Sequence, residues 1–356
     1  MEYITCVKPK EYAGIDFSRI FAAVLVIAIH TAPFSVVSGG LDFLLTYCLG
    51  RIAVPFFLMT TGYFVLGPWN AGGCRDDARI RRFLKKTLLL YLAASLVYLP
   101  VNLYSGGLPD TAGGFLRMIF FDGTFYHLWY FPAAALGCVL AALLLKHFSR
   151  RAALLAASAL WIFGLGGDSY FGLISRLPFL KSVYDAVFSV SSYTRNGVFF
   201  APLFLLTGAL LYESTRKKSC KIREIGADRR TRCRLISGLI LSILLLLAEG
   251  WITYALGFQR HNSMYFFLIP VMYFLFRLLL LVPGHAPVWT RDLSMLVYVI
   301  HPAVLIVLRG LAKAAGLTWL LTDNTMIQFL TVTAVSFAAA ALIGYVTGSI
   351  LKRKGR

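Results

Sequence analysis

Ten long runs of apolar residues constrain this chain most, because each is close to the length that a helix needs to cross a bilayer. Hydrophobic residues make up 58% of the 356 residues and charged residues only 14%. This composition excludes an ordinary water-soluble domain and predicts an all-helical, polytopic membrane bundle of about ten spans. The runs lie at residues 16–36, 42–66, 84–104, 127–145, 152–167, 196–213, 235–256, 264–282, 293–312 and 325–350.

The basic residues test this topology, since cytoplasmic loops of membrane proteins collect Lys and Arg. Most of the 35 Lys and Arg residues fall in segments that an even number of spans places on the same side as both termini. The sequence therefore predicts cytoplasmic N and C termini and a multi-pass protein of a bacterial-type plasma membrane. Topology and attraction to anionic membrane lipid account for the net charge of +19, so nucleic-acid binding is not needed to explain it.

The loops predict a single transmembrane domain over residues 1–356. Its helices, at about 16–213 and 235–350, are joined by a basic cytoplasmic loop at 214–234. On the outer side, the segments 105–126 and 168–195 are longer, and their apolar pieces are expected to lie at the membrane surface or over the bundle mouth. No Cys/His spacing suggests zinc, and no metal is expected.

Two ionisable residues in the first apolar run point to function, because such groups are costly inside a membrane. Arg19 and His30 are eleven residues apart, so a helix places them on one face, separated by roughly 16 Å of rise. His30 lies past mid-depth and Arg19 at the inner edge. We expect this pair to take part in the activity.

Further polar residues are predicted to converge on the outer half of the bundle. They are Arg51, His127, Trp129, Arg195, Asn196, Glu249, His261, Tyr298 and His301. This inventory suits acyl transfer, since a histidine can deprotonate a hydroxyl or carry the acyl group while arginine stabilises the developing oxyanion. It equally suits a zwitterionic amino acid, with arginine for the carboxylate and Glu249 for the ammonium group.

Each of these residues also has a purely structural interpretation. His301 alone is explained by packing, and Arg51 with Glu249 by an ion pair between helices. Trp129 fits an aromatic belt at the membrane interface, and His261 an ordinary loop position. The sequence leaves both interpretations open.

Five motifs along the chain carry a resemblance: Arg19 with His30, RIAVPFFLMTTGYF at 51–64, RRFLKKTLLLYL at 81–92, HLWYF at 127–131 and SMLVYVIHP at 294–302. They resemble the acyltransferase-3 family of ten-helix membrane acyltransferases. The segments 193–211 and 259–276 are also similar to the membrane domain of the VanT-type vancomycin-resistance serine racemases. In those proteins a pyridoxal-phosphate racemase domain follows the last helix, so this chain is expected to be a free-standing relative or the membrane half.

The resemblance implies roles for individual residues. Arg19 and His30 would be the catalytic pair, with His30 as base or acyl carrier. The donor would be an acyl-coenzyme A such as acetyl-coenzyme A, and its acceptor a hydroxyl or amine at the outer face, for example on a cell-wall or surface glycan. The phosphates of the donor would meet Arg79, Arg82, Lys85 and Lys86.

Two alternatives to acyl transfer remain. The racemase resemblance implies a domain that binds or imports L-serine and works with a serine/alanine racemase domain or partner. A membrane anchor or scaffold would need neither Arg19 nor His30.

Overall fold

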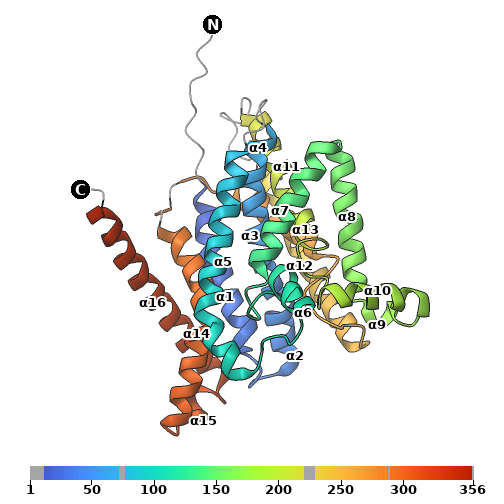
Figure 1. The fold of residues 1–356 in the computed structure, drawn as a ribbon. Coiled ribbons are helices and arrows are strands. Elements are labelled where there is room, and N and C mark those ends of the chain that lie inside the picture. Colours follow the sequence, from blue (N-terminus) through green and yellow to red (C-terminus); the bar gives the residue numbers. More distant parts are fainter. Residues whose placement is uncertain (1–11, 72–76, 220–228, 285, 288, 355–356) are drawn as a thin grey trace.

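The computed structural model describes residues 12–71, 77–219, 229–284, 286–287 and 289–354, which are mostly helical and include no strand (Figure 1). This confirms the all-α prediction. Every predicted apolar run coincides with a helix or a continuous helical stretch. These are α1 (Ala13–Thr31), the stretch α2–α4 (Gly39–Ala71), α5 (Ala78–Ser105), α7 (Tyr130–His147), α8 (Arg150–Gly166), α11 (Ala201–Ser219), α12 (Arg229–Ala255), α13 (Leu268–Leu279), α14 (Trp289–Ala314) and α16 (Thr325–Lys354).

Seven of these stretches are long and apolar enough to cross a membrane. The remaining three differ: α8 and α13 are shorter, with 17 and 12 residues, and α11 ends in a charged turn. The structure therefore supports a multi-pass membrane protein, while the count of ten spans stays a prediction. α1 begins and α16 ends at the same end of the bundle, as an even number of crossings requires (Figure 1).

The predicted loop 214–234 is shorter than expected. α11 continues to Ser219 and α12 begins at Arg229, so both ends of the loop are helical. The residues between them lie outside the described part of the chain.

Short helices cover the end of the bundle away from the start of α1 and the end of α16, which we call the outer end after the predicted topology. They are α6 (Ala112–Arg117), η4 (Met118–Asp122), α9 (Phe171–Ile174), α10 (Pro178–Val190) and α15 (Thr318–Leu321). The first four occupy the two long outer segments, as the apolar pieces of those segments predicted. In Figure 1 they lie at the end of the bundle opposite α4.

α11 is the central helix of the larger hydrophobic core, packing on α3 (Ala53–Thr61), α7 and α8. A methyl group at Gly62 would overlap the backbone of Leu205, and one at Gly208 would overlap that of Met59. These glycines let two backbones touch, which is how membrane helices pack when no hydrophobic effect drives them together. A smaller core joins α1, α14 and α16.

The second helical stretch changes its winding where it carries Arg51. A π-helical segment, η1 (Phe43–Cys48), is followed by a 3₁₀ turn, η2 (Leu49–Ile52), before α3 begins. Pro55 has no N–H to donate to the carbonyl of Arg51, four residues earlier, which accounts for the irregular hydrogen bonding there. Arg51 thus lies on a distorted turn, a common setting for functional side chains.

Candidate functional site: two polar clusters in the outer half of the bundle

Arg19 lies in an ion cluster near the inner end of α1. Its Nε is 3.2 Å from Asp16 Oδ1, and Arg291 of α14 donates to both oxygens of Asp16 at 3.0 and 2.8 Å. Asp16 is buried, so the two arginines together compensate one buried carboxylate. This contact ties the start of α1 to α14 and fixes the direction of the Arg19 side chain.

His30, in the last turn of α1, belongs to a different group, which we call the histidine cluster: His30, His127 and His301. The ring centroids of His30 and His301 are 5.3 Å apart and stacked, and those of His127 and His301 are 5.4 Å apart. The three rings come from α1, the loop before α7, and α14. The structure therefore brings together three predicted site residues that are far apart in the sequence.

Pro302 helps to orient His301. A proline cannot donate to the carbonyl four residues before it, so the Tyr298 carbonyl lacks its helical partner. The Nδ1 atom of His301 lies 2.9 Å from that oxygen and 3.2 Å from the Val297 oxygen. Because carbonyls only accept hydrogen bonds, Nδ1 carries the proton, and Nε2 of the neutral ring is a free acceptor.

Tyr98 of α5 inserts its hydroxyl into the same break in α14. It donates to the Val299 oxygen at 2.6 Å and accepts from the Ala303 N–H at 3.2 Å, so it bridges two backbone groups one turn apart. Tyr298 extends from the next turn and donates to the carbonyl of His127. These bonds hold α5, α14 and the His127 loop in a fixed arrangement.

The histidine cluster has unused hydrogen-bonding capacity. His127 and His301 are 1% and 0% exposed, yet Nε2 of His301 has no partner among the described residues, and His127 has only a weak contact with the Val299 carbonyl. Buried polar atoms are nearly always bonded in proteins. The cluster is therefore suited to a ligand that both donates and accepts hydrogen bonds.

The second group, the arginine cluster, consists of Arg51, Arg195, Asp168 and His261. Arg51 donates to Asn262 and lies over the ring of Tyr47. Neither Arg51 nor Arg195 forms an ion pair with a carboxylate in the described part of the chain, and the Nε of each is buried without a partner. Two half-buried cations thus lie near one carboxylate, that of Asp168, and this excess of positive charge favours an anionic ligand.

Arg195 lies between two aromatic rings. Its guanidinium carbon is 4.8 Å from the Trp129 centroid and 4.5 Å from that of Tyr193. Burial lowers the pKa of Arg195 to about 10, which leaves it protonated at neutral pH. Trp129 therefore contacts the arginine cluster, while His127, two residues earlier, belongs to the histidine cluster.

Asp168 and His261 lie beside the two arginines. Asp168 accepts from the N–H groups of Ser263 and Met264 at 2.8 and 2.9 Å, and its other oxygen is 3.5 Å from His261 Nδ1. Burial alone would raise the pKa of Asp168, but His261 and these N–H donors outweigh it and lower the pKa. Burial lowers the pKa of His261 to about 4, so its ring is neutral at pH 7.

A cavity of about 650 Å³ opens beside Arg51. Asp42, Tyr47, Gln259 and His261 also line it, whereas Arg195 does not. Asp42 was missed by the sequence analysis, although it immediately precedes the π-helical segment. It is buried and accepts from the Phe34 N–H and the Thr46 hydroxyl, so one cavity contains both a cation and a carboxylate.

Two further predicted residues have their hydrogen bonds taken by the protein. Glu249 accepts from Tyr170 at 2.7 Å and from the N–H groups of Phe266 and Phe267 at 2.5 and 2.8 Å. The suggested ion pair between Glu249 and Arg51 does not form. Asn196 accepts from two N–H groups at the start of α11. A role of either residue in substrate binding stays a prediction.

The predicted donor-binding residues lie on the first turns of α5, away from both clusters. Arg79, Arg82, Lys85 and Lys86 are exposed there, and Lys86 is 3.9 Å from Asp292. Among the residues that the structure describes, no group of His, Cys, Asp and Glu side chains has the geometry of a metal site.

Comparisons with known proteins find the same family that the sequence motifs resemble. The model of a family described as an acyltransferase domain, Acyl_transf_3, matches residues 12–346. An amino-acid racemase of Enterococcus faecalis is 35% identical over 93% of this chain and 45% of its own length. A serine/alanine racemase of Enterococcus gallinarum is 36% identical over 90% of this chain and 44% of its own length. The chain thus spans about half the length of these curated relatives, and no solved structure matches it.

Proposed function

The chain belongs to the acyltransferase-3 family, and on that premise we propose that it is a membrane-bound acyltransferase of a bacterial plasma membrane. It moves an acyl group, acetyl in the simplest case, from cytoplasmic acyl-coenzyme A to a hydroxyl or amine at the outer face, such as a cell-wall or surface glycan. The observation that carries this proposal is the histidine cluster, in which buried imidazole nitrogens surround His30 without partners. Such groups can accept a proton from an acceptor hydroxyl.

In this mechanism His30 removes the hydroxyl proton while the acceptor oxygen bonds to the thioester carbonyl carbon. The carbon–sulfur bond breaks, and the departing coenzyme A thiolate takes the proton from His30. If His30 carries the acyl group first, its nitrogen bonds to the carbonyl carbon as the carbon–sulfur bond breaks. The acceptor oxygen then bonds to that carbon as the carbon–nitrogen bond breaks, and the hydroxyl proton passes to the freed imidazole. The protonated Arg195, held beside the His127 loop by its contact with Trp129, is placed to stabilise negative charge on the carbonyl oxygen.

The donor is expected to approach from the inner face. Arg79 and Arg82 carry exposed positive charge at the start of α5, which suits coenzyme A phosphates. Arg19 lies between that face and His30, about 16 Å along α1 from the histidine. An extended pantetheine arm entering the bundle would span this gap.

Binding to the purified protein in detergent tests the donor assignment. Acetyl-coenzyme A is expected to raise the thermal unfolding temperature, and Arg82→Ala to weaken that shift. Lys181→Ala is the control, because Lys181 is an exposed cation on an outer helix. An equal shift in all three proteins would contradict donor binding at α5.

A second function is favoured by a separate observation: Arg51 and Asp42 line the same cavity, and the relatives are named racemases. In this alternative the chain binds or imports L-serine for a racemase domain or partner. Arg51 holds the carboxylate and Asp42 the ammonium group. Stabilisation by L-serine, without any effect of acetyl-coenzyme A, would favour this function over acyl transfer.

A further inference from the structure

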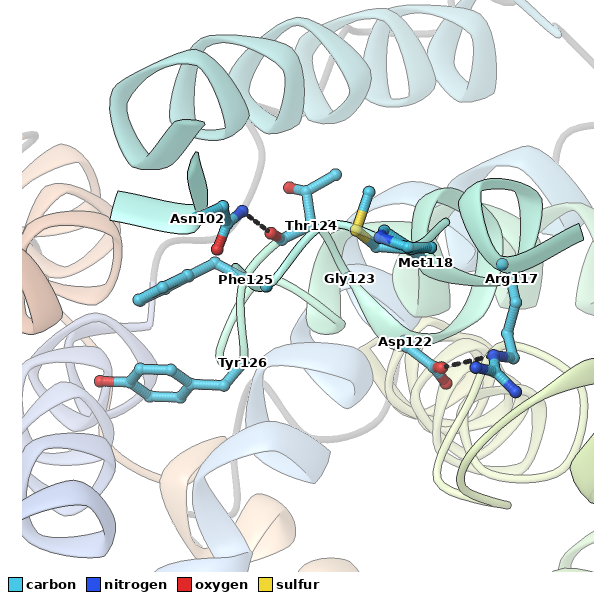
Figure 2. A pocket seen from close by; sticks show the side chains of 11 residues that line it. Asn102, Arg117, Met118, Asp122, Gly123, Thr124, Phe125 and Tyr126 are labelled. Atoms are coloured by element: carbon cyan, nitrogen blue, oxygen red, sulfur yellow. Dashed lines mark hydrogen bonds and ion pairs between the residues drawn. The ribbon is translucent and has the colours of Figure 1, made fainter. Parts of the chain in front are cut away.

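A second outer cavity, of about 340 Å³, lies beside the histidine cluster and has no part in the mechanism above. It is formed by the end of α5, by α6 and η4, and by the loop that leads to His127. Its lining includes Asn102, Gly107, Arg117, Asp122 and Tyr126. Figure 2 shows Arg117 and Asp122 on one side of this pocket and the rings of Phe125 and Tyr126 on the other.

The charges of this pocket are already compensated within the protein. Arg117 Nε is 3.5 Å from Asp122 Oδ2, and Asp122 also accepts from the N–H and the hydroxyl of Ser192 at 2.9 and 2.7 Å. The other lining residues are neutral. A charged ligand would lose water here without gaining a free counter-charge, so the pocket favours an uncharged one.

Tyr126 connects this pocket to His30. It lines the cavity, and its ring centroid is 4.8 Å from that of His30, edge to face. The neighbouring Phe125 is stacked on Tyr98 at 4.5 Å, which fixes the loop. Tyr126 itself is 44% exposed. Its ring therefore contacts the pocket on one side and His30 on the other.

We propose that this pocket is the entrance for the acceptor, and that it takes an uncharged, hydroxyl-bearing compound such as a neutral sugar. The acceptor hydroxyl passes Tyr126 and reaches His30, where its proton moves to the imidazole as the new ester bond forms and the thioester bond breaks. The hydroxyl donates its single proton to His30, and a ring N–H of His127 donates a hydrogen bond to the hydroxyl oxygen. This assignment rests on the proposed acyl transfer for its chemistry, but the route to His30 can be tested separately.

The test measures access to His30 with diethyl pyrocarbonate, a small neutral reagent that modifies histidine, followed by mass spectrometry of the full-length protein in detergent. Gly107→Leu is designed to fill the pocket, because a Cβ there meets nothing closer than the Ser105 hydroxyl at 3.3 Å. Gly113→Leu is the matched control, since it adds the same side chain into open space nearby. The rate of modification of the exposed His147 shows that every sample received the same amount of active reagent.

Gly107→Leu is expected to slow modification of His30 at least tenfold, and Gly113→Leu to leave it unchanged. Tyr126→Ala is expected to speed it several-fold, because the ring that separates the pocket from His30 is then absent. Equal rates at His30 in all these proteins would overturn the route. If Gly107→Leu slows modification of His30 but the wild-type protein transfers no acyl group, the proposed function is refuted while the route to His30 is supported.

The chemistry of the acceptor is tested by protection of His30 in the wild-type protein. N-acetylglucosamine, which is uncharged, is expected to protect His30 from the reagent. Glucosamine, which carries an ammonium group in place of the acetamido group, is expected to protect it at least tenfold less well. Equal protection by both sugars, or by neither, would overturn the assignment of an uncharged acceptor.

Discussion

The histidine cluster and the arginine cluster lie in the same outer half of the bundle but differ in charge. The first has neutral acceptors and a pocket whose charges are paired. The second has two cations for one nearby carboxylate, that of Asp168, and a cavity lined by Arg51 and Asp42. Proton transfer needs a group that can gain and lose a proton, whereas anion recognition needs a fixed charge. The difference teaches that one fold can keep a neutral hydrogen-bonding cluster and a cationic cluster apart, although His127 of the first and Trp129 beside the second are only two residues apart.

The largest effect is expected for His30→Ala. Acetyl transfer should fall by about 10²–10⁴-fold, because a positioned general base is removed. L-serine binding at the arginine cluster should change less than twofold. Release of coenzyme A from acetyl-coenzyme A and serine calorimetry measure the two effects, with His147→Ala as control. If both properties fall together, the two clusters are not independent.

Arg51→Gln is expected to weaken L-serine binding, whereas His30→Ala is expected to weaken acetyl transfer. It keeps an amide that can donate to Asn262 but removes the charge, so affinity for L-serine should fall roughly 10- to 100-fold, as for loss of one charge-assisted hydrogen bond. Calorimetry of wild type, Arg51→Gln and the surface control Lys181→Gln measures this loss. Unchanged serine affinity in Arg51→Gln would remove the reason for the second function.

Asp42→Asn sharpens the comparison within the arginine cluster. If Asp42 holds the ammonium group, the substitution should weaken L-serine about tenfold and leave L-glycerate, which lacks that group, unaffected. Competition between the two ligands for the wild-type and variant proteins measures this. A similar loss for both would mean that Asp42 only supports the fold, through its bonds to Phe34 and Thr46.

The smallest effect concerns pH and stability. Burial lowers the pKa of His261 to about 4 from an ordinary 6.5, so on acidification below pH 6.5 the unfolded chain binds a proton that the folded chain does not. The part of the stability that depends on His261 should be nearly constant above pH 7 and fall by about 2 kcal/mol between pH 7 and 5. Thermal unfolding of wild type and His261→Gln measures this; equal pH dependence in both would exclude His261 as the cause.

The sequence located most of the candidate site because polar residues are conspicuous against an apolar background. His30, His127 and His301 were each visible as an ionisable group at membrane depth, and the spacing of Tyr298 and His301 placed them on one helix face. Asp42, Tyr98 and Tyr126 were missed. An acidic or aromatic residue near a helix end is common, and only its partners reveal that it lines a cavity or bridges a broken helix.

The structure shows neighbours of two predicted residues that the sequence did not reveal, while their roles stay predictions. Glu249 is suited by charge to bind an ammonium group, yet two N–H groups at the start of α13 and Tyr170 occupy its oxygens. Arg19 shares a face with His30, yet Asp16 and Arg291 give it an environment of its own. Residue type predicts what a side chain can bind, but not which competing partner is nearest.

The sequence by itself determined that this chain is a helical membrane protein. The length of each apolar segment and the distribution of basic residues between loops are local properties, and they decide whether a segment is stable in a bilayer. Only the tertiary structure decided which polar residues meet. Close packing at Gly62 and Gly208 and the break at Pro302 set how helices approach one another and where backbone bonds are left open. Those contacts join residues hundreds of positions apart, and they divided the polar residues into a neutral cluster and a cationic one.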